Sequence, residues 1–429
     1  MSTTALPASS RRLLVDLMVM AMRASVMGCK FGLALFIARY LDLSSLGLYG
    51  LAAGAIAAVP IVVNLGMNHL LMRDAVTAST DDMIDSMRHY WGFVGFSYTA
   101  LLTIAALVTV LLGTTSLWIL IVAVIAFEHV GNDIFYLLSS LQRHIWANAI
   151  GFIRGGAWIL VFVPLAIWDT SFRSLPYLFG FWLVGGAASV GLFAFLSRSW
   201  PWLASFSRPF RVAVITDAIR RSYLMLLSDL GFITSQYIDR YLITLFLGLK
   251  VAGVYFLFWT VGSSATTFLG LVLQQKQRPS LISAYRTSGP SAHRQLAWRF
   301  LQTTTLATVA LSTAVGFTFQ VLLPWVAPQP ALIAQLSAFW LIVAGLAVRY
   351  MADFGALALF TAHLDRLTTV TNLASVGVLV LAQLALLPIA GLHGAGAAIL
   401  LASLIMTLWR YWLLFGFPVS NVYSRRAGV

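Results

Sequence analysis

Long apolar stretches run through almost the whole of this 429-residue chain, and they constrain its fold more than any other feature. A helix needs roughly 20 mostly apolar residues to cross a lipid bilayer, and twelve stretches are long enough. They lie at about 13–38, 47–70, 90–112, 117–141, 149–168, 176–196, 223–247, 253–273, 300–325, 332–357, 367–387 and 395–415. Hydrophobic residues make up 60% of the chain and charged residues 10%, whereas about a quarter of a soluble globular protein is charged. The sequence therefore predicts an all-α polytopic membrane protein with twelve transmembrane helices.

The links between these stretches leave no room for an enzymatic domain. The longest, at about 72–89, 197–222 and 274–299, are too short to fold independently. The single Cys29 excludes an internal disulfide and a cysteine-based metal site. The seven histidines are scattered without metal-ligand spacing, and no nucleophile–base set or nucleotide loop stands out. We expect a protein without catalytic residues, bound metal or cofactor.

A short pattern that occurs twice indicates two related halves. Leu-x-Leu-x-x-x-Gly-x-Tyr-x-Leu starts at Leu41 and again at Leu247, an offset of 206 that is close to half of the chain. Chance is the alternative in so apolar a chain, but the glycine and the tyrosine match in the same topological place. Because six spans separate the copies, the repeat is parallel, with its axis along the membrane normal. We expect an N-lobe at 1–210 with helices 1–6 and a C-lobe at 211–429 with helices 7–12, an organisation typical of transporters.

The distribution of basic residues predicts the orientation in the membrane. If the N-terminus is cytoplasmic, eighteen basic residues fall in cytoplasmic links and three, Arg39, Arg173 and Lys250, on the other side. This positive-inside bias explains most of the net charge of +13 as topology, and it argues against a nucleic-acid surface. It predicts a multi-pass protein with both termini cytoplasmic. The eighteen are Arg11, Arg12, Arg73, Arg88, Arg143, Arg198, Arg208, Arg211, Arg220, Arg221, Lys276, Arg278, Arg286, Arg294, Arg299, Arg366, Arg425 and Arg426.

Charged residues inside the spans are candidate functional residues, because each costs about 2.5–3.5 kcal/mol at the bilayer centre. The basic ones are Arg23, Lys30, Arg154, Arg240, Arg349 and Arg410, and the acidic ones are Asp16, Glu128, Asp133, Asp229, Asp239 and Asp353. Arg410 lies near a cytoplasmic end, where its side chain can snorkel to the interface. Arg349 and Asp353 are four residues apart and can neutralise each other.

The first span carries its charges on one face. Asp16, Arg23 and Lys30 are spaced by seven residues, so they line one side of a helix at intervals of about 10 Å. Lipid cannot solvate such a stripe of charges. The charged face must therefore form the wall of a water-filled cavity or take part in a buried structural network. A net basic cavity implies an anionic ligand, and the planar fork of arginine suits phosphate. Offset 206 also equates Arg23 with Asp229, which predicts either a pair across the cavity or separate partners within each lobe.

Several short motifs resemble those of polysaccharide-exporting flippases of the Wzx type. They are Ala38-Arg39-Tyr40-Leu41, Gly47-Leu48-Tyr49, Asn64-Leu65-Gly66-Met67, Arg73, Ile238-Asp239-Arg240, Gly253-Val254-Tyr255 and the run Gly391 to Ala398. Asn64 departs from the family pattern, in which an aspartate is more usual. The motifs cover the start of each half, and the rest of the chain is similar only in hydropathy.

The resemblance implies the multidrug/oligosaccharidyl-lipid/polysaccharide exporter superfamily, in which two six-helix lobes surround a central cavity. Wzx-type members move undecaprenyl-pyrophosphate-linked sugar units to the periplasmic leaflet of the bacterial inner membrane. The implied ligand is a lipid-linked anionic oligosaccharide, contacted by Arg23, Lys30, Arg154 and Arg240. Candidates for gating or ion coupling, to a proton or sodium gradient, are Asp16, Glu128, Asp229, Asp239 and Asp353. Membrane lipids and other polysaccharide-assembly membrane proteins are the further partners that it implies.

Three alternatives remain open at this stage. A drug or cation exporter of the same superfamily would be expected to have a mainly acidic cavity, whereas basic groups here at least equal the acidic ones. A polytopic polymerase or ligase would need a substantial external loop, and the expected external links have about ten residues or fewer. A major-facilitator transporter normally carries a basic signature between its second and third spans, which the segment 73–89 lacks.

Overall fold

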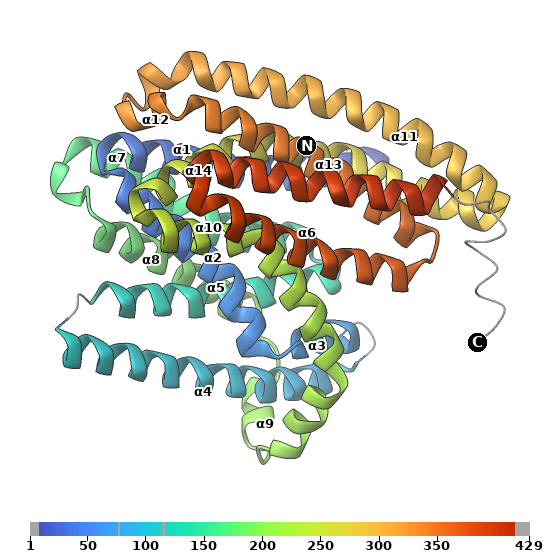
Figure 1. Ribbon diagram of the computed structural model, residues 1–429. Coiled ribbons are helices and arrows are strands. Elements are labelled where there is room, and N and C mark those ends of the chain that lie inside the picture. Colours follow the sequence, from blue (N-terminus) through green and yellow to red (C-terminus); the bar gives the residue numbers. More distant parts are fainter. Residues whose placement is uncertain (1–7, 76–77, 114–115, 417–429) are drawn as a thin grey trace, which may run out of the picture. The chain divides into compact units, whose positions relative to one another are not determined.

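The computed structural model describes residues 8–75, 78–113 and 116–416, and the regular secondary structure of these residues is entirely helical (Figure 1). Arg425 and Arg426, which were counted for the cytoplasmic side, lie outside the described residues. The elements of the first half are α1 Ala8–Tyr40, α2 Leu43–Asn64, α3 Met67–Ala75, α4 Thr80–Leu112, α5 Leu117–Ser140, α6 His144–Phe152, the π-helical turn η1 Ile153–Ala157, α7 Trp158–Trp168, the 3₁₀ turn η2 Thr170–Phe172, α8 Leu175–Leu196 and α9 Trp202–Phe206. Those of the second half are α10 Val212–Leu269, the π-helical turn η3 Gly270–Gln274, α11 Gln275–Val326, α12 Pro330–Ala334, α13 Leu336–Thr361 and α14 Asp365–Phe415.

Three long helices of the second half each reverse direction at a glycine. Gly248 in α10 and Gly289 in α11 have φ near +80° with extended ψ, and Gly391 in α14 has φ +57° and ψ −132°. Residues with a side chain rarely adopt these angles. Hydrogen bonds join the two arms of each helix. Tyr255 donates to Asp239 in α10, Gln277 donates to Thr304 in α11, and Gln383 donates to the Ala395 carbonyl in α14. Each of the three is therefore a pair of antiparallel helices joined by a very tight turn.

Nine helices in the described part of the chain are long and apolar enough to cross a membrane. Two of them, Ile233–Val326 with 94 residues and Asp365–Phe415 with 51, contain the glycine reversals. The polytopic all-α prediction is confirmed. The count differs from the expected twelve because the turns at Gly248, Gly289 and Gly391 are too tight to interrupt the helical runs.

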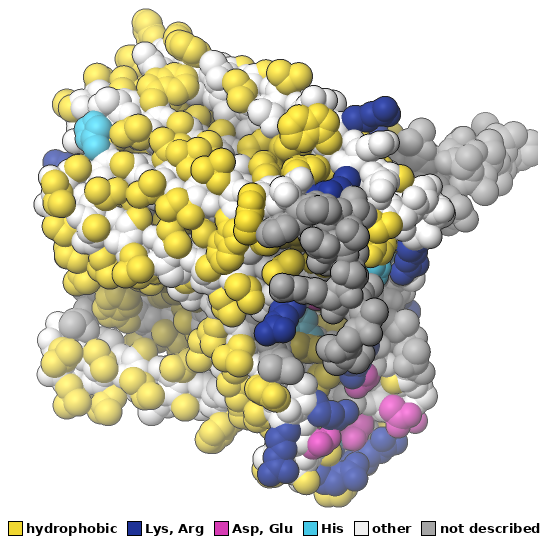
Figure 2. Space-filling view, turned by 45° about the vertical axis from the view of Figure 1, so that its right-hand side comes forward, with side chains coloured by type: hydrophobic (Ala, Val, Ile, Leu, Met, Phe, Trp, Pro, Cys, Tyr) yellow, Lys and Arg dark blue, Asp and Glu magenta, His cyan; other side chains and the backbone are white. Residues whose placement is uncertain are grey.

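Large apolar side chains are exposed along these helices, as expected where helices face lipid. On α4, Phe96, Val110 and Leu112 are each more than 70% exposed. Hydrophobic side chains cover most of the face seen in Figure 2, and basic side chains gather toward one side of it. Membrane-facing helices of this kind bury their polar groups inward.

The described chain divides into two compact units. The N-unit comprises the described residues up to Phe36 and those from Ala52 to Leu230, and the C-unit comprises Ile37–Leu51 and the described residues from Gly231 onward. The change from one to the other falls inside α10. The segment 37–51, which contains the first copy of the repeated pattern, thus packs with the second half of the chain. The lobes at 1–210 and 211–429 stay a prediction.

Within the C-unit, the two copies of the repeated pattern contact each other reciprocally. A Cβ on Gly47 would lie 2.2 Å from the carbonyl oxygen of Leu249, and a Cβ on Gly253 would lie 1.8 Å from that of Leu43. Leu43 and Leu249 are equivalent at offset 206, and so are the two glycines. In each copy the glycine therefore lies against the equivalent leucine carbonyl of the other copy, which is the arrangement of a two-fold symmetric contact. Both glycines are required because a backbone carbonyl occupies the space of the side chain.

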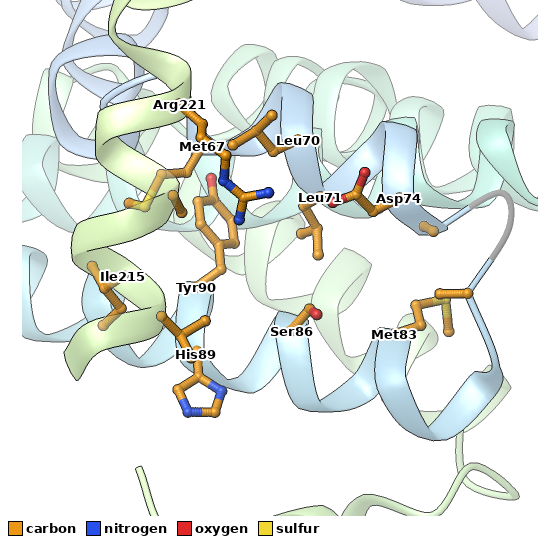
Figure 3. Close-up of a pocket in the computed structure, with 14 residues that line it drawn as sticks. Met67, Leu70, Leu71, Asp74, Met83, Ser86, His89, Tyr90, Ile215 and Arg221 are labelled. Atoms are coloured by element: carbon orange, nitrogen blue, oxygen red, sulfur yellow. The ribbon is translucent and has the colours of Figure 1, made fainter. Parts of the chain in front are cut away.

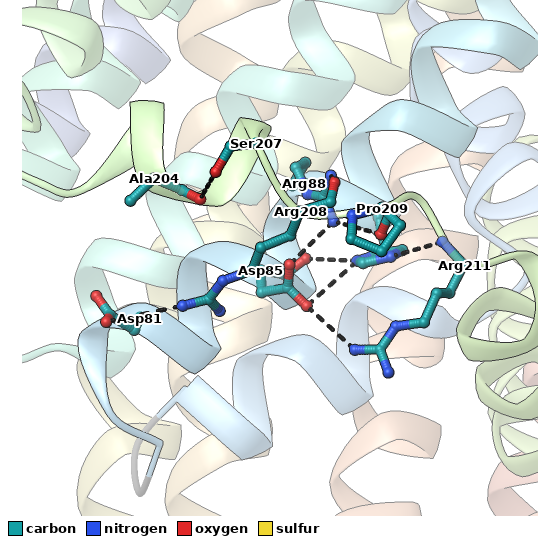
Figure 4. A network of polar contacts seen from close by, with 9 residues as sticks. Asp81, Asp85, Arg88, Ala204, Ser207, Arg208, Pro209 and Arg211 are labelled. Carbon is teal, nitrogen blue, oxygen red and sulfur yellow. Dashed lines mark hydrogen bonds and ion pairs between the residues drawn. The ribbon is translucent and has the colours of Figure 1, made fainter.

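The link after α8 is fastened to α4 in the N-unit (Figure 4). The Arg88 guanidinium donates to the carbonyl oxygens of Arg208 and Pro209 at 2.6 and 3.1 Å and to the Asp85 carboxylate at 3.0 Å. The amide N–H of Arg211 donates to Nε2 of His89 at 3.0 Å. The start of α4 and the link 197–222 were both assigned to the cytoplasmic side, and these contacts place them on the same side.

Candidate functional site

Four elements of the N-unit assemble a charged cluster: α1, α5, α8 and η1. Arg154 lies in η1, a single π-helical turn of a kind frequent at functional sites. Its side chain crosses α5 at Gly131, where a Cβ would lie 2.6 Å from Arg154 Cδ. A glycine at this crossing lets the arginine reach its partner on α5.

The partner of Arg154 is Glu128. Arg154 Nη1 donates to Glu128 Oε2 at 2.6 Å and to the Glu128 carbonyl oxygen at 2.7 Å. The indole N–H of Trp182, on α8, donates to Glu128 Oε1 at 2.7 Å. Glu128 is buried, so this pair compensates a charge that would be costly alone.

Lys30 and Arg23 on α1 add positive charge beside this pair. Lys30 is exposed, its stem lies against Gly155, and it interacts electrostatically with both Glu128 and Arg154. Arg23 is also exposed, and its Nε donates to Asn148 Oδ1 on α6 at 2.9 Å. Three of the four predicted cationic residues thus belong to the N-unit. Lys30, Arg154 and Glu128 are brought together, and Arg23 reaches α6, the helix that continues into η1.

Arg240, the fourth predicted cation, belongs to the C-unit and is 3% exposed. Its guanidinium lies 4.4–5.0 Å from the ring centres of Tyr237, Phe256 and Trp259, and Nη1 approaches the Gly50 carbonyl at 3.4 Å. Stacking on aromatic faces stabilises a desolvated guanidinium. A ligand can reach Arg240 only if these rings move.

Three other charged residues at membrane depth in the C-unit, Asp239, Arg349 and Arg410, make internal contacts. Asp239 is buried and accepts a hydrogen bond from Tyr255. Arg349 donates to the Ser235 carbonyl at 2.9 Å, and Asp353 is exposed. The snorkelling prediction for Arg410 is wrong: it is 3% exposed and donates to Ala352, Thr371 and Asn372. Polar partners on α13 and α14 hold it inside the unit.

Asp229 and Asp16 differ in their surroundings. Asp229 pairs with His69 of α3 at 2.7 Å within the N-unit, whereas Asp16 is exposed. The pKa of His69 is raised by this hydrogen bond and by the negative charge of Asp229. In this structure Arg23 and Asp229 have separate partners, Asn148 and His69, so neither expectation holds in full. Arg23 and Asn148 both lie within the expected lobe 1–210, whereas Asp229 lies within 211–429 and its partner His69 within 1–210.

A buried polar set on α4 and α5 was missed by the sequence reading. His129 and Asp133 are each 1% exposed. The ring of His129 contacts the hydroxyls of Tyr90 and Tyr98, and Asp133 accepts a hydrogen bond from Tyr90. Asp133 was noted only as an intramembrane acid, and His129 only as one of the scattered histidines. Their spacing of four residues on one apolar helix was the available signal, because it places both on one face. In the described residues, no group of three or more His, Cys, Asp or Glu could hold a metal ion.

Solved structures identify the fold. No protein-family model matches the chain, and no curated protein matches it. An inward-facing MATE-family multidrug transporter of the MOP superfamily aligns with a TM-score of 0.65 at 13% identity, covering 94% of this chain and 96% of that one. The lipid II flippase MurJ in an inward closed conformation aligns with a TM-score of 0.67 at 12% identity, covering 96% and 89%. An outward-facing MATE-family transporter aligns with a TM-score of 0.56 at 14% identity, covering 94% of each chain.

The chain has the fold that these three proteins share. The proteins that share this fold here are described as multidrug transporters and a lipid II flippase. At these identities the likeness establishes the fold, and the residues must carry any argument about the cargo.

Proposed function

We propose that the protein is a flippase that moves an undecaprenyl-pyrophosphate-linked oligosaccharide from the cytoplasmic to the periplasmic leaflet by alternating access. The observation that carries the proposal is the cluster of Lys30 and Arg154 around one neutralising carboxylate, Glu128, with Arg23 on the same helix as Lys30. Exposed cations at membrane depth favour an anionic headgroup, and arginine can bind phosphate oxygens through two parallel hydrogen bonds.

The proposal includes twelve transmembrane helices in two six-helix lobes related by a parallel repeat. Separating the arms at Gly248, Gly289 and Gly391 supports this number. The reciprocal contact of Gly47 and Gly253 supports the repeat. We place the protein in a bacterial inner membrane with both termini cytoplasmic, on the evidence of the basic links.

A drug exporter is the second candidate, because several similar structures are MATE multidrug transporters. Cationic drugs would favour acidic groups in the N-unit. The acid beside Lys30 and Arg154, Glu128, is already paired with Arg154. An anionic cargo therefore fits this cluster better.

The test is complementation of a strain that lacks the gene. Loss of the protein is expected to leave a lipid-linked glycan on the cytoplasmic leaflet, and the wild-type gene restores export. Arg23→Ala/Lys30→Ala is expected to fail at equal membrane abundance, whereas Arg286→Ala, which removes an exposed arginine of α11, restores export. Normal export by the double variant would refute the cationic site, and accumulation of a drug with no change in glycans would favour the exporter.

A further inference from the structure

A buried polar network joins α4 and α5 in the N-unit. The Tyr90 hydroxyl donates to Asp133 Oδ2 at 2.9 Å, and its oxygen lies 3.1 Å from His129 Nε2. The Tyr98 hydroxyl lies 3.1 Å from His129 Nδ1. His129 Nε2 and Asp133 Oδ2 are 3.5 Å apart. Both ring nitrogens of His129 therefore have a polar partner in a site that solvent does not reach.

The charge of this network is not compensated locally. Arg154 is the cation that acts on Asp133, but its direct partner is Glu128. From the elements packed around α5, α4 contributes Tyr90, Tyr98 and Trp91, whose indole also acts on Asp133. The helix α8 carries no Asp, Glu, Lys, Arg or His, and the one titratable residue of α6, His144, is exposed. The buried side chains of α3 are apolar, and its charged residues are exposed. A buried carboxylate under these conditions requires a proton nearby or a share of a cation that is already paired.

A pocket connects this network to the end of the N-unit that is predicted to be cytoplasmic. It has a volume of about 90 Å³ and is lined by α3 and by the first turns of α4 and α10 (Figure 3). Asp74, Ser86, His89 and Arg221 supply polar groups, and Tyr90 belongs to the same lining. The rest of the lining is apolar, and a pocket of this size with these polar groups has room for water molecules. Tyr90 is therefore the one residue that belongs both to the pocket wall and, through its hydroxyl, to the carboxylate of Asp133.

We propose that His129 and Asp133 form a proton-binding site that exchanges with the pocket through Tyr90 and sets the charge of the neighbouring cationic cluster. With Asp133 ionised and His129 neutral, the charges of Lys30, Arg154, Glu128 and Asp133 cancel. One bound proton gives these groups a net charge of +1. Proton binding and anion binding to Lys30 and Arg154 therefore strengthen each other, and the linkage is reciprocal. The link to an anionic cargo rests on the proposed function, whereas the proton site does not.

The proton site is tested first, on purified protein in lipid nanodiscs without any ligand. Infrared difference spectra between pH 8 and pH 5.5 are expected to show a carboxylic acid band or an imidazolium band. Asp133→Asn should remove the carboxylic acid band and His129→Gln the imidazolium band, and Asp81→Asn, an exposed acid of α4, should change neither. If one variant fails to fold, the other decides. Spectra of the wild type with neither band, or bands that persist in both variants, would overturn the site.

The linkage is tested with farnesyl pyrophosphate as the anionic probe. The Asp133→Asn variant has no carboxylate at this position, so its site carries no negative charge at any pH. The variant should therefore bind the probe more tightly than the wild type at pH 8 and equally tightly at pH 5.5. The expected difference at pH 8 is roughly 5- to 150-fold, the usual range for coupled binding sites. The pyrophosphate of the probe changes its own ionisation with pH in the same way in both measurements. The ratio of the two affinities, variant to wild type, therefore isolates the effect of the site. A ratio that does not change with pH refutes the linkage. Failure of the probe to bind either protein, with the infrared bands present, instead counts against the anionic cargo.

Discussion

Replacing Gly253 by alanine perturbs the reciprocal contact between the two copies of the repeated pattern. The new methyl carbon would lie 1.8 Å from the Leu43 carbonyl oxygen, whereas non-bonded heavy atoms prefer about 3.5 Å. The copies must therefore separate by more than about 1 Å, and a backbone carbonyl within a helix cannot rotate away as a side chain would. Overpacking typically costs about 1–3 kcal/mol, and we expect the upper end here. About 3 kcal/mol corresponds to a shift of roughly 100-fold between contacting and separated states.

The contact lies at the end of the C-unit helices that is predicted to face the periplasm, so its separation should expose the residues around it to reagents added from that side. The assay is labelling of Ser44→Cys, in a Cys29→Ser background, with a membrane-impermeant maleimide added from outside. Gly253→Ala is expected to speed labelling and to reduce export, because the closed state is depopulated. Gly377→Ala is the matched control within the same unit, since a methyl group there meets no atom within 4 Å. Unchanged labelling and export in Gly253→Ala would refute a contact that must close during transport.

Three further predictions concern orientation, a buried arginine and pH. Reporter fusions after residues 80, 145, 210 and 285 should read cytoplasmic and fusions near 43, 171, 250, 328 and 391 periplasmic; a cytoplasmic signal at 250 would break the parallel repeat. Arg240→Met should lower the thermal stability of the purified protein by more than Arg286→Met, because Asp239 loses its nearest compensating charge inside the C-unit. The His69–Asp229 pair should stabilise the protein below pH about 6.5 and lose this effect as the pH rises through the raised pKa of His69. The difference in melting temperature from Asp229→Asn should therefore shrink at alkaline pH, and it should correspond to less than about 1 kcal/mol because His69 is 45% exposed.

The tight turns show what local sequence can predict. The run Asn64-Leu65-Gly66 was recognised as a motif without a role for Asn64, and the expected second span continued to residue 70. In the structure α2 ends at Asn64, whose Oδ1 accepts the amide N–H of Gly66 at 2.7 Å, and Leu65 and Gly66 both have positive φ. Asparagine and glycine favour such turns. The apolar residues that follow form α3, a separate short helix, which hydropathy alone does not distinguish from the end of a span.

The surroundings of Arg240 show what local sequence could not predict. Its position at membrane depth was predicted, and this depth suggested a cavity. The three rings that enclose it come from its own arm of α10 and from the arm beyond Gly248. Whether a charge at that depth faces water or aromatic rings depends on the packing of the two arms. Arg410 is similar, because its acceptors lie on α13 and on the first arm of α14. Periodicity gives the face of a helix but not the neighbour on that face.

The two copies of the repeated pattern agree in their backbone contact, whereas equivalent positions elsewhere differ in charge. Offset 206 equates Gly47 with Gly253, and both are fixed because each meets a carbonyl oxygen. The same offset equates Asp239 and Arg240 with Leu33 and Ala34, which are buried and apolar. A backbone contact between copies forbids a side chain on both glycines, so both must be kept together. Charged side chains make no such reciprocal contact, so each half could acquire its own. A substitution that spares the backbone contact can therefore change the charge of one half without disturbing the other.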